Sequence, residues 1–233
     1  MSQDYKEASK TATLEDGPRA EDEAGNPVGA TLAEGPIEEG GDVTGEGEVP
    51  GFDQETLRKR EAALAQIVQY GNPVLKSRAS DVAGFDQALS DEIDRMIVLM
   101  QESLGVGLAA NQVGKLRRLL VFQTNADAIP QALVNPEIEW LSEETESMVE
   151  GCLSIPRVVV EVERPLFARV SGRDRTGEPV LIEASGHEAR VLQHEIDHLN
   201  GVLILDRTER SQRRGALKAL RGGESYTPPV EDE

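Results

Sequence analysis

Two histidines separated by three residues constrain the fold of this 233-residue chain more than any other feature. The segment reads His194-Glu195-x-x-His198. Residues four apart lie on one face of an α-helix, one turn apart, so both imidazoles could bind one metal ion. The chain has only three histidines, which makes chance a weak explanation for this spacing. The pattern predicts a metal-binding helix over residues 185–199, with Glu195 placed to reach a water on the metal.

A metal site of this kind needs at least one more ligand. Zincin-type metalloproteases find theirs downstream, but the acids after His198 surround a basic helix. The remaining candidate is Cys152, the only cysteine, in the segment Glu150-Gly151-Cys152. A free cysteine is commonly a small buried apolar residue. Gly151 allows close backbone approach, however, and the polar surroundings suit a site better than a core.

Composition excludes several classes of protein. One cysteine allows no intrachain disulfide, and the polar residues 1–10 do not resemble a signal peptide. The longest aliphatic run, over residues 96–100, is far shorter than the roughly 18 residues needed to span a bilayer. The net charge of -19 disfavours a general nucleic-acid binder. These features predict a soluble cytoplasmic protein with no membrane contact.

The acidic residues concentrate at the start of the chain. Residues 1–50 contain 13 Asp or Glu and three Lys or Arg, a net charge of -10, and show no apolar periodicity. Such a segment cannot bury enough apolar surface to offset its ordering entropy. We therefore expect a disordered acidic tail over residues 1–51, a catalytic domain over 52–222 and a disordered C-terminus over 223–233.

The apolar pattern of the domain predicts an α+β fold. Residues 86–103 have apolar side chains at spacings of three and four, as an amphipathic helix requires. Further helices are predicted loosely over residues 57–69 and more clearly over 185–199 and 206–221. Short strands are expected over residues 119–123, 131–134, 158–162, 167–171 and 179–182. This order predicts short antiparallel or mixed strands around a central metal-binding helix, with a C-terminal helix.

Three blocks of sequence together resemble the signature motifs of one enzyme family. They are Gly-Val-Gly-Leu-Ala-Ala-Asn-Gln over residues 105–112, Glu-Gly-Cys-Leu-Ser over 150–154 and Gln-His-Glu-Ile-Asp-His over 193–198. In their order and approximate spacing they are similar to the motifs of peptide deformylase. The resemblance covers roughly residues 64–210 and leaves out the acidic tail.

The resemblance implies a metal held by Cys152, His194 and His198, with water as the fourth ligand. Iron(II) is the metal that the family favours in vivo, and zinc or nickel could replace it in a purified sample. The implied reaction removes the N-formyl group from the N-terminal methionine of newly made polypeptides and releases formate. Glu195 would carry the proton. The side-chain amide of Gln112 and the backbone N–H of Leu153 would stabilise the oxygen on which charge builds.

The resemblance also implies how formyl-methionyl nascent peptides bind. Gly105 and Gly107 would leave room for the peptide to add as a strand, and Gly151 would also allow its close approach. Val106 and Glu150 could line the pocket for the methionine side chain.

The C-terminal helix reverses the sign of the chain's charge. Residues 207–221 contain six basic residues and one acid, a net charge of +5. Some family members bind ribosomal RNA through this helix, so the resemblance implies a ribosome contact here. The alternative, given equal weight, is a solvated helix with cations near its C-terminal end.

Two other functions compete with deformylation. A zincin-type protease would use the same helix motif but would need a downstream third ligand. A non-catalytic peptide-binding relative of the deformylases would have lost Glu195, Gln112 or a metal ligand. All of these residues are present, and the zincin alternative leaves the other two blocks unexplained.

Overall fold

The computed structural model describes residues 52–125 and 127–229. The predicted acidic tail over residues 1–51 and the last residues, 230–233, lie outside the described residues. The predictions of disorder for these two segments are therefore not tested by the structure.

The larger of two sheets is antiparallel and has five strands in the order β1-β2-β3-β6-β7. The strands are β1 Gly107–Ala109, β2 Leu119–Phe122, β3 Gln131–Leu141, β6 Phe167–Arg173 and β7 Pro179–Ser185. Strand β2 shows why this sheet is central, because all four of its residues are buried. Leu119 and Val121 join one hydrophobic core, whereas Leu120 and Phe122 join another. Successive side chains of a strand point to opposite faces, so both faces of the sheet are covered here.

The smaller sheet is a separate antiparallel pair formed by β4 Thr145–Cys152 and β5 Ile155–Pro165. Val158, Val160 and Val162 alternate with more exposed residues along β5 and are almost completely buried. They form a third core with the C-terminal helices α4 Ile204–Arg207 and α5 Arg210–Gly222. The smaller sheet therefore has its own apolar support.

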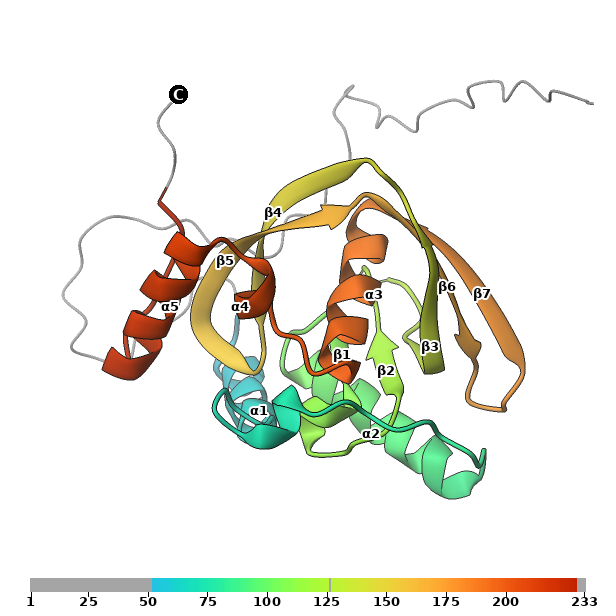
Figure 1. The fold of residues 1–233 in the computed structure, drawn as a ribbon. Helices are drawn as coiled ribbons and strands as arrows, with labels where there is room; N and C mark the ends of the chain where they lie inside the picture. The colour runs from blue at the N-terminus through green and yellow to red at the C-terminus, as the bar shows by residue number, and fades with distance from the viewer. Residues whose placement is uncertain (1–51, 126, 230–233) are drawn as a thin grey trace, which may run out of the picture. The chain divides into compact units, whose positions relative to one another are not determined.

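Three longer helices complete the domain, α1 Gln54–Leu64, α2 Gln87–Glu102 and α3 Gly186–Leu199. Short 3₁₀ helices span Pro73–Lys76 and Ala110–Val113. Helix α2 packs its Ile93, Met96 and Met100 in the core with Leu119 and Val121. Helix α3 packs on the other face of the larger sheet and also contacts β5. Figure 1 shows α3 between the two sheets, where it can present residues to both.

The structure confirms the predicted α+β class and the helix that carries both histidines, and differs from the sequence prediction in several places. Helix α1 ends at Leu64 instead of residue 69, and β3 continues to Leu141 instead of ending at residue 134. The sequence pattern does not predict strands β1 and β4, because β1 has only three residues and β4 is exposed along most of its length. The helix expected over 206–221 is divided, because Thr208 has an extended backbone that ends α4. Tyr226, expected in the disordered C-terminus, bonds through its N–H and C=O to β5 at Arg157 and Val159.

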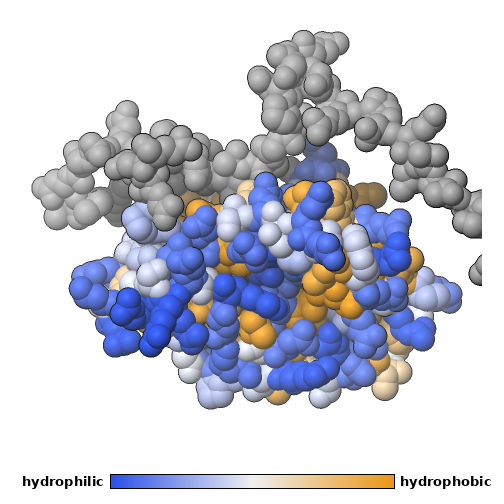
Figure 2. Space-filling model, turned by 45° about the horizontal axis from the view of Figure 1, so that its top comes forward, coloured by the Kyte–Doolittle hydropathy of each residue, from blue (hydrophilic) through white to orange (hydrophobic). Residues whose placement is uncertain are grey.

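One face of the molecule shows how polar and hydrophobic residues are distributed on the surface. Figure 2 shows a largely hydrophilic face with hydrophobic atoms gathered in a few patches. Exposed large hydrophobic side chains include Trp140 on β3 and Met148 and Val149 on β4. Among the described residues, no helix combines the length and apolar character that crossing a bilayer requires.

Candidate metal centre

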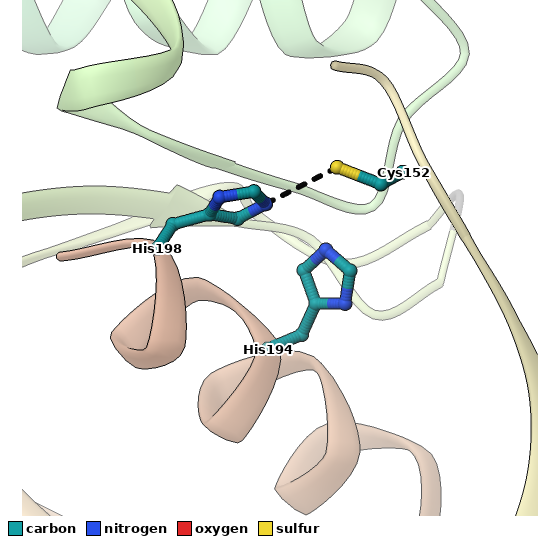
Figure 3. A group of neighbouring side chains, drawn as sticks. All are labelled: Cys152, His194 and His198. Carbon is teal, nitrogen blue, oxygen red and sulfur yellow. Dashed lines mark hydrogen bonds between the residues drawn. The ribbon is translucent and has the colours of Figure 1, made fainter. Parts of the chain in front are cut away.

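The three predicted ligands lie together although they come from different elements. His194 and His198 project from one face of α3, and Cys152 faces them from the end of β4 (Figure 3). The Cys152 Sγ lies 3.2 Å from the His198 Nε2. One ligand atom from each residue lies within 4.8 Å of the other two. The helical spacing and the strand end therefore converge on a single point.

The donor set fits a divalent metal ion. Tetrahedral coordination with ordinary metal–sulfur and metal–nitrogen bonds separates the ligand atoms by about 3.5 Å, and the distance of 3.2 Å between the Cys152 Sγ and the His198 Nε2 is close to this value. One thiolate and two imidazoles suit zinc or iron(II) better than magnesium or calcium. The residues form a Cys/His/His metal site with three protein ligands. Three ligands leave one tetrahedral position open, as in catalytic sites.

The two ligand histidines have opposite pKa shifts. Burial lowers the pKa of His198 well below its usual value, and the charge of His194 lowers it further. Burial also acts to lower the pKa of His194, but hydrogen bonds with Cys152 and Glu150 outweigh it and raise that pKa well above its usual value. Because metal ligands must be deprotonated, metal binding at these residues competes with protons.

Glu150 lies behind His194, on the side of its Nδ1. Its carboxylate is almost completely buried and accepts a hydrogen bond of 3.0 Å from the His194 Nδ1. Arg164 binds both carboxylate oxygens, at 2.6 and 3.0 Å, and Arg190 binds one at 2.7 Å. Burial acts to raise the pKa of Glu150, but the hydrogen bonds from His194 and Arg164 outweigh it and hold the pKa far below its usual value. The position of this carboxylate does not fit the predicted contact with a methionine side chain.

The buried charges continue from Glu150 to the C-terminal segment. Arg164 also donates to Asp197, at 2.9 Å, and Asp197 accepts from Arg207 as well. Arg207 comes from α4, whereas Asp197 lies one residue before the ligand His198. Two carboxylates and three guanidinium groups thus connect β4, β5, α3 and α4 behind the metal site.

Glu195 is buried next to the ligands with one oxygen unsatisfied. Its side chain is 4% exposed, and its Oε2 has no hydrogen-bond partner among the described residues. Burial raises the pKa of Glu195 to about 7, although the charges of His194 and Arg164 oppose the shift. A carboxyl group with this pKa can accept and release a proton near neutral pH.

The glycines of the first sequence block have close neighbours within the protein. A Cβ atom at Gly107 would lie 2.8 Å from the Cγ of Glu195, and one at Gly105 would lie 2.8 Å from the Cδ1 of Leu153. Distances under 3.0 Å are too short for carbon atoms, so a side chain at either position would displace its neighbour. Glu195 and Leu153 therefore account for the glycines at these two positions, independently of any role of the glycines in peptide binding.

Gln112 is fixed in the same buried region. Its Oε1 accepts from the backbone N–H of Ala109 at 2.8 Å. Its Nε2 lies 3.4 Å from the Ser154 Oγ and 3.8 Å from the Cys152 Sγ. The bond to Ala109 orients the amide, so that its N–H groups point toward the metal ligands.

The structure brings together most of the predicted site residues, but sequence reasoning missed two buried arginines. Arg190 lies four residues before His194, on the same helix face by spacing. Arg164 follows the alternation of the buried valines along β5. The pattern assigns both positions to the interior of the protein. A basic residue at such a position indicates a buried ion pair, and this signal could have identified both arginines.

Two histidines one helical turn apart, a cysteine from a neighbouring strand and a buried glutamate define the site's class. They are the features of a metallohydrolase that binds one ion on an α+β domain.

Comparisons with known proteins identify the particular family. Residues 64–214 match the family model described as "Polypeptide deformylase". Peptide deformylase 1 of Corynebacterium glutamicum is 47% identical over 161 residues, which cover 68% of this chain and 95% of that protein. The crystal structure of peptide deformylase from Thermotoga maritima shares 48% identity with a TM-score of 0.60, covering 61% of this chain and 96% of that one. The crystal structure of a peptide deformylase from Synechococcus elongatus in complex with actinonin shares 40% identity with a TM-score of 0.64. The match covers 70% of this chain and 91% of that one.

The chain belongs to the peptide deformylase family. Its function is that of a peptide deformylase, a metal-binding hydrolase that acts on formylated nascent peptides in protein biosynthesis. The family and the function predicted from the sequence are confirmed. The zincin alternative is not supported, because the third ligand is the upstream Cys152 and not a downstream acid.

Proposed function

We propose that this site hydrolyses the N-formyl group of formyl-methionyl peptides with Glu195 as the proton carrier. The observation that carries the proposal is the position of Glu195. Its carboxylate is buried beside the Cys/His/His ligands and occupies the space that a side chain at Gly107 would fill. One of its oxygens has no hydrogen-bond partner in the described part of the chain. A group in that position can take a proton from an attacking water and deliver it to the departing amine.

We propose iron(II) as the physiological metal, with zinc or nickel possible in a purified sample. The thiolate and two imidazoles accept any of these ions. When bound, the ion supplies Lewis acidity that lowers the pKa of a water toward neutrality and polarises a carbonyl oxygen. The protein's part is to fix the three ligands, and Glu150 supports this by holding the Nδ1 of His194.

Gln112 and Leu153 are the proposed donors to the formyl oxygen, on which negative charge builds. The bond from Ala109 fixes the amide of Gln112, so its N–H groups need little reorganisation during the reaction. The side chain of Leu153 occupies the space beside Gly105, which fixes the backbone around its N–H. Removing one donor of this kind typically costs about 3 kcal/mol of transition-state stabilisation.

We propose that the peptide binds as an added strand along β1. Within the described residues, this strand is at the edge of its sheet and pairs with β2 alone. Gly105, Val106 and Gly107 would provide backbone contacts, with Gly151 of β4 across from them. Val106 is half-buried and is the side chain that we assign to the methionine pocket in place of Glu150.

The direct test is the product formed by the anaerobically purified protein, with its metal content measured on the same sample. We expect release of formate from a formyl-Met tripeptide, in proportion to bound metal, and no cleavage of casein. Cleavage of casein without formate release would contradict the proposal.

We also propose that α5 contacts ribosomal RNA in the cytoplasm. Four basic residues of α5 follow the spacing i, i+4, i+8 and i+11, which places them within about 80° of each other on the helix. They are Arg210, Arg214, Lys218 and Arg221, named here the basic stripe. All four are exposed and none forms an ion pair within the described part of the chain. The stripe lies opposite the buried Ala216 and Ala219 and could follow a phosphate backbone.

The structure removes two of the predicted basic residues from this surface. Arg207 binds Asp197, and Arg213 lies 3.5 Å from Asp206. Deleting residues 207–233 would also remove packing on β5. Substitution of the four residues of the basic stripe is therefore a better test than the deletion, because it leaves this packing in place.

The test replaces the four residues of the basic stripe by glutamine and measures ribosome co-sedimentation over a range of salt. A matched control makes the same charge change at the exposed Arg58, Arg60, Arg78 and Arg95. We expect the stripe variant to bind more weakly at low salt and with a smaller salt dependence, while formate release stays unchanged. Equal binding by both variants would contradict the contact.

A further inference from the structure

We propose that Arg190 is a positioning residue, which acts through Glu150 to align the strand that carries Cys152 with the helix that carries both histidines. The proposal goes beyond the assigned activity, because it concerns how the metal ligands are kept in register. Arg190 itself contacts none of the three ligands in the hydrogen bonds of the described residues.

The metal site needs such an alignment because its ligands belong to separately built parts. Cys152 ends β4 in the two-stranded sheet, whereas α3 packs on the five-stranded sheet. Within the described residues, no strand of one sheet pairs with a strand of the other. The small sheet also has a separate apolar core with α4 and α5. Ladder hydrogen bonds therefore do not set the position of Cys152 relative to the histidines.

Side-chain hydrogen bonds make the connection: Arg164 and Gln193 join β5 to α3, and Arg190 joins α3 to both strands of the small sheet. From α3, its Nη1 donates to the Glu150 Oε1 at 2.7 Å and to the Val162 carbonyl at 2.9 Å. Its Nη2 donates to the Glu146 carbonyl at 2.6 Å. One side chain thus holds β4 at two places and β5 at one. Arg190 lies one turn before His194, and Glu150 lies two residues before Cys152, so both ligand-bearing elements are fixed next to their ligands.

A planar guanidinium suits this role better than an apolar contact would. Apolar packing is not directional, whereas these hydrogen bonds require defined distances and angles. The side chain of Arg190 is 7% exposed, so its charge is stable only when its partners are in place. Arg164 also binds Glu150 but comes from β5 of the same sheet. Arg164 reaches α3 only through Asp197, whereas Arg190 is the residue of α3, besides the ligand His194, that binds Glu150 directly among the described hydrogen bonds.

The test measures Co(II) binding to Arg190→Met, Arg190→Lys and Arg169→Met by competition with a chelator. Arg169→Met is the control, because Arg169 forms an exposed ion pair with Glu183 on the larger sheet. We expect Arg190→Met to bind Co(II) about 10- to 100-fold more weakly, as is typical when a residue behind a ligand is lost. The thiolate-to-cobalt absorption band should also change. Arg190→Lys should show a smaller loss, and Arg169→Met none.

A second comparison shows whether Arg190 acts through Glu150. In a Glu150→Gln background, adding Arg190→Met should weaken Co(II) binding little further. A full additional loss would contradict this route.

Stability measured on the metal-free proteins separates positioning from support of the fold. A fall in melting temperature with Co(II) affinity and spectrum unchanged would overturn the proposal. If Arg190→Met does not fold, the Co(II) affinity of Arg190→Lys is the deciding measurement. An unchanged affinity in that variant would equally overturn the proposal. None of these measurements uses formate release, so their failure would leave the proposed reaction mechanism standing.

Discussion

The two sheets hold α3 by different forces. The five-stranded sheet packs apolar residues against the Leu192 and Ile196 side of the helix. The two-stranded sheet is held by hydrogen bonds and ion pairs, from Arg190 to Glu150 and from Arg164 to Asp197. Each sheet also supplies a different part of the site: β1 provides the space for Glu195, and β4 provides Cys152.

The two kinds of contact contribute differently to the stability of the fold and to the alignment of the metal ligands. Burial of apolar area contributes most of the free energy of folding but tolerates small shifts between elements. Buried ion pairs contribute little net stability, because desolvation offsets their attraction, yet their geometry is specific. We infer that the apolar side keeps α3 in the fold and the charged side sets the position of the metal ligands.

Substitution of Cys152 by serine should have the largest effect on the charged side. A hydroxyl group is a poor replacement for a thiolate, so metal affinity and formate release should fall together. We expect each to fall by more than about 100-fold, beyond the loss typical of a residue behind a ligand. Elemental analysis and the formate assay measure both. Full metal occupancy with normal turnover would remove Cys152 from the site.

Gly107→Ala should damage the chemistry and spare the metal. The added Cβ would displace the carboxyl group of Glu195, and a displacement of about 1 Å can reduce turnover about 100-fold. Bound metal should remain at one ion per chain. Gly84→Ala is the control, since nothing lies within 4 Å of a Cβ at that position. Equal activity of the two variants would show that the space beside Glu195 does not matter.

Leu133→Ala tests the apolar side of the comparison. Leu133 is 1% exposed in the core that joins the larger sheet to α3. Its truncation should lower the free energy of unfolding by about 2–5 kcal/mol, while Co(II) affinity measured well below the melting temperature changes less than with Arg190→Met. Denaturant unfolding gives the first quantity. A larger loss of Co(II) affinity than in Arg190→Met would reverse the roles assigned to the two sheets.

Deletion of residues 1–50 should have the smallest effect. The segment lies outside the family match, which begins at residue 64, and its net charge of -10 predicts a solvated tail. We expect formate release within a few-fold of the full chain and an unchanged melting temperature. A large loss of either would show that the segment packs on the domain.

The sequence predicted the parts of this account that depend on local spacing. The histidines of α3 and the alternation of β5 could be read directly, because helix and strand periods place those residues. The division of the strands into two sheets could not be predicted in this way, since strand pairing depends on contacts between residues distant in sequence. For the same reason the sequence does not show that Glu150 binds His194. Its partners Arg164 and Arg190 come from other elements, and no local pattern connects them to it.

The most direct test of the central claim is Glu195→Gln with metal content and formate release measured on the same preparation. The substitution keeps the size of the side chain and removes the carboxylate that carries the proton. We expect one metal ion per chain and turnover reduced about 100- to 10,000-fold, the range that general acid–base catalysis supplies. Turnover within tenfold of the unaltered protein, at the same metal content, would contradict it.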